Sequence, residues 1–131
     1  RASAETSYVS VTSTSNSFAK RMVRLRDQAK FRREESCAVV VGSAPILELC
    51  AQGGGAEGCL QALMLLEEEG RDMWHADFLA SLDTSPPLIY VASTAVFQKV
   101  AGLESAEGRQ AAAEIRLPQM QTVAEMLRPT V

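Results

Sequence analysis

The apolar residues between positions 17 and 28 recur with the period of an α-helix. At about 100° per residue, three of them share one stripe: Phe18, Met22 and Leu25. Ser15 or Asn16 stands just before them, and either side-chain oxygen can accept a hydrogen bond from the first helical turn. The pattern predicts a helix that ends at Asp27 or Gln28, followed by a short second segment, Ala29 to Glu35.

Four later segments are short, apolar and bounded by glycine, proline or polar residues, which is typical of β-strands. They are Cys37 to Val41, Leu60 to Glu67, Leu88 to Ala92 and Ala111 to Leu117. The first is a continuous β-branched run, which predicts a strand buried on both faces. The second also fits a helix, but its flanking glycines and short length favour a strand.

Helical patterns alternate with these strands. They cover Ile46 to Ala51, Asp72 to Leu82, Ala95 to Ala101, and a last amphipathic stretch over residues 120–127. Ser43 and Pro45 open the first, and Ser93 or Thr94 and then Gly102 bound the third. This alternation predicts an α/β domain with a mixed, largely parallel sheet of about four or five strands, preceded by two basic helices.

The length of 131 residues and an apolar share of 47% are typical of one domain. We expect a flexible segment over residues 1–15 with Tyr8 to Val11 extended, the domain over 16–118, and a linker or helix over 119–131. Gln52 to Gly58 is a glycine-rich linker without the lysine of a phosphate-binding loop. No apolar run approaches the roughly 20 residues of a membrane span, so no membrane partner is expected.

Charge is distributed unevenly along the chain. Residues 1–36 hold eight Lys or Arg against four Asp or Glu, whereas the remainder holds five against twelve. Seven of the basic residues lie close together: Lys20, Arg21, Arg24, Arg26, Lys30, Arg32 and Arg33. Lys20, Arg21 and Arg24 fall opposite the apolar stripe, whereas Arg26 lies near it. A basic end on an acidic body predicts a local anionic partner, with a solvated helix face as the alternative.

Arginines spaced along two short elements can follow a phosphate backbone, because each guanidinium offers paired donors to phosphate oxygens. No pair of exposed aromatic residues marks a strand of the RNP type. Recognition of phosphates and RNA shape is therefore the expected mode.

Residues with catalytic or metal-binding chemistry are few. His75 is the one histidine and has no acid or cysteine at ligand spacing, and Glu67-Glu68-Glu69 reads as a solvated charge run. Cys37, Cys50 and Cys59 form no CxxC pair, which favours buried thiols in a reducing compartment. No catalytic residue and no metal site are predicted in this chain.

Several short stretches follow one another in a characteristic order. They are Thr12-Ser13-Thr14-Ser15-Asn16, Ala19-Lys20, Leu25-Arg26, Arg32-Arg33-Glu34-Glu35, Val39-Val40-Val41-Gly42, and later Val91-Ala92-Ser93-Thr94 with Phe97, Val100 and Gly102. This order resembles the amino-terminal domain of the SpoU/TrmH-type RNA ribose 2′-O-methyltransferases. That domain reads as Ser-x-x-Asn-Pro, a lysine, an Arg-Arg-x-x-Gly stretch and a strand ending in Glu-Gly. The resemblance covers about residues 9–118.

The resemblance implies a ribosomal-protein-like α/β sandwich that binds rRNA or tRNA through Asn16 and the seven basic residues. The family's catalytic domain begins with a strand leading into Asp-Pro-x-Asn-x-Gly, binds S-adenosylmethionine in a knot and dimerises through it. None of its motifs occurs here, and the chain ends at Pro129-Thr130-Val131, about where that strand is expected. The resemblance therefore implies a substrate-binding domain with no cofactor of its own, within a longer homodimeric enzyme.

Two departures from the family pattern are informative. Ser17 replaces the proline after the asparagine, and Val41 replaces the acid before Gly42, which resembles the branch of the family in photosynthetic eukaryotes. The small, hydroxylated start of the chain is similar to the remainder of a transit peptide. Together they favour an organelle, the chloroplast before the mitochondrion.

Two other functions remain open. A stand-alone RNA-binding or ribosome-associated protein could use the same fold, but such kink-turn binders carry Gly-x-Asn-Glu and a lysine where this chain has Gly42-Ser43-Ala44-Pro45. That difference favours the methyltransferase domain. A protein-interaction module with an acidic partner is the third, and its binding would be insensitive to ribonuclease.

Overall fold

The computed structural model describes residues 8–51, 59–82 and 88–117. Within them, five strands form one sheet in the order β1-β4-β3-β5-β2. The strands are β1 (Tyr8–Val11), β2 (Cys37–Val41), β3 (Leu60–Leu66), β4 (Ile89–Ala92) and β5 (Ala111–Arg116). All four strands predicted after the basic helices are present, including the ambiguous segment that begins at Leu60.

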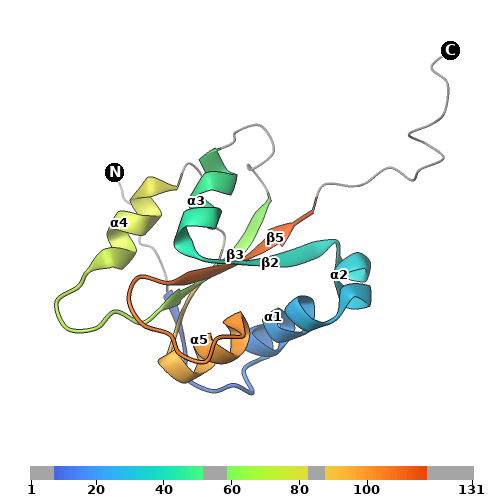
Figure 1. The fold of residues 1–131 in the computed structure, drawn as a ribbon, viewed down its shortest axis with the longest axis horizontal. Helices are drawn as coiled ribbons and strands as arrows, with labels where there is room; N and C mark the ends of the chain where they lie inside the picture. Colours follow the sequence, from blue (N-terminus) through green and yellow to red (C-terminus); the bar gives the residue numbers. More distant parts are fainter. Residues whose placement is uncertain (1–7, 52–58, 83–87, 118–131) are drawn as a thin grey trace, which may run out of the picture.

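Helices cover both faces of this sheet, so the domain has three layers (Figure 1). The helices are α1 (Ser17–Asp27), α2 (Ala29–Glu35), α3 (Ser43–Ala51), α4 (Trp74–Ser81) and α5 (Thr94–Ala101). Helices α1, α2 and α5 lie on one face, and α3 and α4 lie on the other. The predicted α/β class is confirmed.

The sheet is mixed, with four strands pointing one way. β4 is parallel to both β1 and β3, whereas β5 is antiparallel to both β3 and β2. Only β5 is therefore reversed among the described strands. The predicted mixed and largely parallel sheet is confirmed in this sense, although no sequence signal singled out β5 as the reversed strand.

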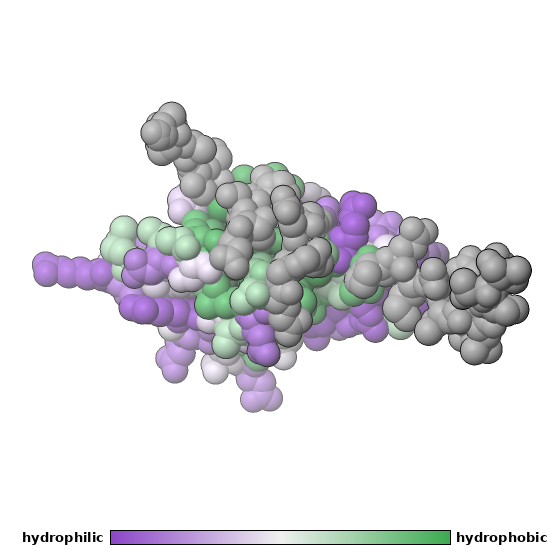
Figure 2. All heavy atoms as spheres, turned by 90° about the horizontal axis from the view of Figure 1, so that it is seen from above, coloured by the Kyte–Doolittle hydropathy of each residue, from purple (hydrophilic) through white to green (hydrophobic). Residues whose placement is uncertain are grey.

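The hydrophobic core centres on β3, because helices cover that strand from both sides. From Ala62 to Leu66 every side chain of β3 is buried, and the stripe of Phe18, Met22 and Leu25 packs from α1. Seen from the α3 and α4 side, apolar residues gather at the centre and polar residues project at the rim (Figure 2).

One strand prediction needs correction. β2, predicted to be buried on both faces, is an edge strand in which Cys37 is buried and the four following residues are only half-buried. A run of valines indicates a strand but does not tell a central place from an edge. Tyr8–Val11, extended as predicted, is paired with β4 and so belongs to the sheet although it lies in the segment expected to be flexible.

Local capping explains where the helices begin and end. Asn16 caps α1, Ser93 caps α5, and Gly102 ends α5 in the left-handed region with φ of 71°. Ser43 does not cap α3; it lies in the first turn, and its hydroxyl donates to the carbonyl of Arg109. The linker at 52–58 and the helix at 120–127 lie outside the described residues. None of the described helices has the length and apolar character needed to cross a bilayer.

Candidate nucleic-acid interface

The basic cluster lies on α1 and α2, which meet at a sharp joint. Gln28 ends α1 and precedes α2 in an extended conformation, with φ of −117° and ψ of 106°. Arg32 crosses this joint, because its Nη1 donates to the carbonyls of Leu25 and Arg26 at 2.7 Å each. A cation that binds the last carbonyls of a helix is favoured by the helix dipole. Arg32 therefore fixes the two helices relative to each other.

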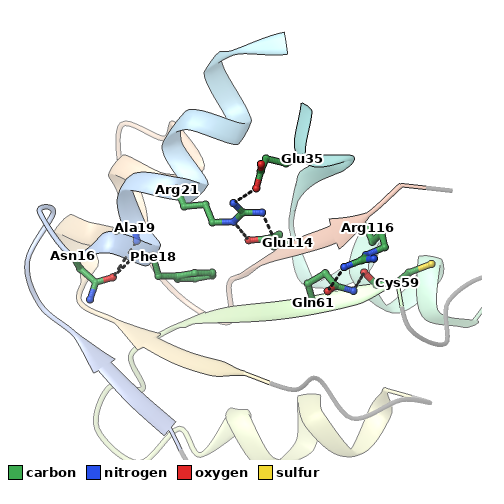
Figure 3. A network of polar contacts seen from close by, with 9 residues as sticks. All are labelled: Asn16, Phe18, Ala19, Arg21, Glu35, Cys59, Gln61, Glu114 and Arg116. Carbon is green, nitrogen blue, oxygen red and sulfur yellow. Dashed lines mark hydrogen bonds and ion pairs between the residues drawn. The ribbon is translucent and has the colours of Figure 1, made fainter. Parts of the chain in front are cut away.

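Arg21 turns toward the sheet instead of toward solvent. Its Nε and Nη2 donate to the two carboxylate oxygens of Glu114 on β5 at 2.9 and 3.0 Å, and its Nη1 donates to Glu35 at 2.6 Å (Figure 3). The hydrogen bonds that Arg21 donates to Glu114 raise the pKa of Arg21 above its ordinary value, against the opposing effect of burial. The charge of Arg21 is thus compensated twice within the domain. Its predicted place on the free face of α1 is wrong.

Glu114 is the carboxylate that holds the Arg21 side chain against the sheet. Only 8% of its side chain is exposed, compared with 33% of the side chain of Arg21. A buried carboxylate requires a partner, and a two-pronged guanidinium meets both of its oxygens. The neighbouring thiol of Cys37 shares this environment, since burial and the charge of Glu114 raise its pKa.

Arg26 packs against the end of α5, in agreement with its place near the apolar stripe. It pairs with Asp27 at 3.2 Å and donates to the carbonyl of Lys99 at 3.4 Å. Its guanidinium lies so close to Gly102 that a Cβ there would come within 2.5 Å of Nη1. The left-handed conformation therefore favours glycine at position 102, and a side chain there would also displace the Arg26 guanidinium.

Asn16 acts first as a helix cap. Its side-chain oxygen accepts hydrogen bonds from the amides of Phe18 and Ala19 at 2.9 and 3.1 Å (Figure 3). The oxygen of Asn16 is therefore used to begin α1, as its position in the sequence predicts. Its contact with RNA stays a prediction.

The remaining cations of the cluster project outward. Lys20, Arg24, Lys30 and Arg33 are exposed and form no ion pair with any carboxylate in the described ranges. The Arg24 guanidinium lies 3.9 Å from the centre of the Phe31 ring, and its Nε donates to Gln28 at 3.3 Å. Stacking on Phe31 holds the Arg24 guanidinium in place between the two helices.

A hollow lies on the outer side of α1. It has a volume of about 410 Å³ and is bordered by three cations, Lys20, Arg24 and Lys99, together with the hydroxyl residues Thr14 and Ser15. We call these five residues the outer basic site. Asp27 also borders the hollow, but its carboxylate is paired with Arg26.

Lys99 was missed in the sequence because it lies on α5, far along the chain from the cluster. The packing of α5 against α1 brings it to the outer basic site. Its only sequence signal is that it is the basic residue in the last turn of α5. Lys30 and Arg33, which belong to the predicted cluster, do not border this hollow.

The chemistry needed for metal binding is absent from the described residues. No group of three or more His, Cys, Asp or Glu side chains in residues 8–51, 59–82 and 88–117 could hold a metal ion. His75 is buried with its Nε2 2.7 Å from the carbonyl of Leu66, and its backbone amide donates to Glu68. These contacts hold the start of α4 against the end of β3.

Several solved structures with a similar fold are RNA methyltransferases. An RNA 2′-O ribose methyltransferase matches with a TM-score of 0.61 and 25% identity, over 93% of this chain and 42% of that one. An rRNA methyltransferase from Sinorhizobium meliloti matches with a TM-score of 0.59 and 14% identity, over 86% and 38%. The SpoU methyltransferase AviRb from Streptomyces viridochromogenes matches with a TM-score of 0.54 and 16% identity, over 79% and 34%.

These likenesses are structural. No family model and no curated protein matches the sequence. The chain spans well under half the length of each of these structures. It therefore shares an α/β fold with one part of SpoU-type RNA 2′-O-methyltransferases. Another matching structure is that of an AdoMet-bound rRNA methyltransferase from Sinorhizobium meliloti.

Proposed function

We propose that this chain is the RNA-binding, substrate-recognition domain of a SpoU/TrmH-type ribose 2′-O-methyltransferase. The observation that carries the proposal is the outer basic site. Lys20 and Arg24 on α1 and Lys99 on α5 border one hollow, and none of the three has a carboxylate partner among the described residues. Cations held in this way are available to neutralise phosphates.

Electrostatics and fold support the same conclusion. The chain carries a net charge of −3, so a generally cationic surface does not account for this local group of cations. The fold is also found in one part of RNA methyltransferases. This likeness supports RNA as the ligand of the basic group. Lys30 and Arg33 on the neighbouring helix would extend the phosphate path beyond the hollow.

The methyl transfer itself belongs to a further domain in this proposal. That domain would hold S-adenosylmethionine and form the homodimer, whereas the residues described here would bind and orient rRNA or tRNA. A location in an organelle, the chloroplast before the mitochondrion, is part of the same proposal. Deleting the gene and mapping ribose 2′-O-methyl groups tests the enzymatic part: an RNA bound by this chain should lose a methyl group.

RNA binding is tested by a pair of charge-matched double variants. Lys20→Ala with Arg24→Ala removes two cations from the outer basic site, whereas Arg71→Ala with Arg109→Ala removes two exposed cations elsewhere. Each phosphate contact contributes roughly 0.7–0.9 to the slope of log affinity against log salt. The first double variant should therefore flatten the slope by roughly 1.4–1.8 on fragments of rRNA or tRNA.

The control double variant should leave both the slope and the affinity unchanged. Equal behaviour of the two double variants would contradict the assignment of the outer basic site. Binding that survives in a lysate after ribonuclease treatment would instead support an acidic protein partner.

A further inference from the structure

A second hollow lies on the sheet side of α1, where the helix leaves part of β3 and β4 uncovered. Its volume is about 480 Å³, within the roughly 300–1,000 Å³ of small-molecule sites. Its walls include the rings of Phe18 and Tyr90, the polar side chains of Ser17 and Gln61, and the Arg21–Glu114 pair. We call it the sheet groove. Figure 3 shows Phe18 and Gln61 on the same side of β3 as that pair.

Two parallel rings line the sheet groove. Phe18 of α1 and Tyr90 of β4 stack with their centroids 3.9 Å apart and their planes 7° from parallel. Phe18 is almost fully buried, whereas Tyr90 is half-buried. Proteins use aromatic side chains as surfaces on which unpaired bases of RNA stack.

The charged residues of the sheet groove do not favour a phosphate. Arg21 and Glu114 neutralise each other, and Glu35 adds a second carboxylate to the same guanidinium. Ser17 and Gln61 present hydroxyl and amide groups, which can both donate and accept hydrogen bonds. The Gln61 amide is oriented by its contacts with Arg116 and with the carbonyl of Cys59. A neutral, planar and hydrogen-bonding ligand fits this wall better than an anion.

We infer that the sheet groove holds one unstacked nucleobase of the bound RNA, and this inference rests on the proposed function. Helix α1 connects the two sites, because Lys20 and Arg24 belong to the outer basic site while Ser17 and Phe18 border the sheet groove. The RNA backbone would be held on the outer side of α1, and one base would enter the groove on its inner side. Single-stranded loops are the parts of RNA whose bases are free to do so.

Replacement of the half-buried Tyr90 ring tests the inference. Tyr90→Leu keeps an apolar contact for Phe18 but removes the stacking surface. Tyr8→Leu is the matched control, because Tyr8 is the other tyrosine of the sheet and lies on the opposite face, near His75 of α4. The probes are a hairpin RNA with an unpaired adenine- and cytosine-containing loop and a fully paired duplex of equal length.

Tyr90→Leu should weaken hairpin binding roughly tenfold, because stacking of one base on an aromatic ring contributes about that much. It should leave duplex binding and the salt slope unchanged, and Tyr8→Leu should change neither. Equal hairpin affinity of Tyr90→Leu and the wild type, or an equal loss on both probes, would overturn the inference.

Amide chemical shifts of the wild-type protein give a measurement that needs no variant. The hairpin should shift the amides of Ala62 and Tyr90 beside the groove, and the duplex should not. Hairpin-induced shifts confined to Lys20, Arg24 and Lys99 would refute the groove while leaving the proposed function standing. A wild-type chain that binds neither RNA would overturn both.

Discussion

Lys20 and Arg21 are neighbours on α1, yet they serve different parts of the molecule. Lys20 borders the outer basic site, whereas Arg21 reaches the sheet and pairs with Glu114. One step along a helix turns a side chain by about 100°, which is enough to move a cation from solvent to the sheet. A count of the basic residues along the chain therefore overstates the charge that is available for binding.

The same division runs through the whole basic cluster. Arg21, Arg26 and Arg32 hold α1 against the sheet, α5 and α2 respectively. Lys20 and Arg24 remain available on the outside, and α5 adds Lys99 to them. We call the first three the inner cations, because they stabilise the fold. The other three are the outer cations, and they remain available for binding. Variants of each kind should separate stability from affinity.

The largest effect on stability is expected from loss of the ion pair between Arg21 and Glu114. Arg21→Ala would leave Glu114 buried without its two-pronged partner, which should lower the free energy of unfolding by about 2–3 kcal/mol. This is less than the ~3–5 kcal/mol of a fully buried pair, because 33% of the Arg21 side chain is exposed. Urea denaturation measures the loss. The salt slope of RNA binding by the folded variant should not change.

A double replacement checks the cause of that loss. Arg21→Met with Glu114→Met removes both charges and should recover most of the stability, since apolar replacements of buried pairs are often well tolerated. A double variant as unstable as Arg21→Ala would show that lost packing, and not an unpaired carboxylate, accounts for the effect.

An intermediate effect is expected at the joint between α1 and α2. Arg32→Ala removes two hydrogen bonds to the carboxyl end of α1 and should cost about 1–2 kcal/mol in urea unfolding, with no change in the salt slope. The adjacent Arg33→Ala is the matched control and should stay within about 0.5 kcal/mol of the wild type. A reversed order of the two variants would refute the division between inner and outer cations at this joint.

The smallest effect is expected at Lys99, and it concerns RNA binding alone. Lys99→Ala should flatten the dependence of log affinity on log salt by roughly 0.7–0.9, the contribution of one phosphate contact, without changing stability. Arg71→Ala, an exposed cation that borders neither hollow, provides the comparison and should keep the wild-type slope. If both variants keep the wild-type slope, α5 contributes no cation to the interface.

Much of the fold could be predicted because its signals are local. The apolar stripe of Phe18, Met22 and Leu25, the Asn16 cap and the Gly102 stop each depend on neighbours within a few residues. The same holds for β3 to β5, which are short apolar runs between breaking residues. The edge position of β2 and the reversal of β5 could not be predicted, because pairing partners come from distant parts of the chain.

In the candidate site, too, some features follow from local sequence and others depend on distant parts of the chain. The sequence by itself determined that α1 and α2 are basic and that one stripe of α1 enters the core, because both properties follow from helical spacing. Only the tertiary structure decided which cations remain available for binding, since Arg21 is paired with Glu114 and α5 contributes Lys99. It also brought Phe18 onto Tyr90. A buried carboxylate needs a cationic partner to remain charged. The spacing of residues along one helix does not show which cation that partner is, because Glu114 lies in a distant part of the sequence.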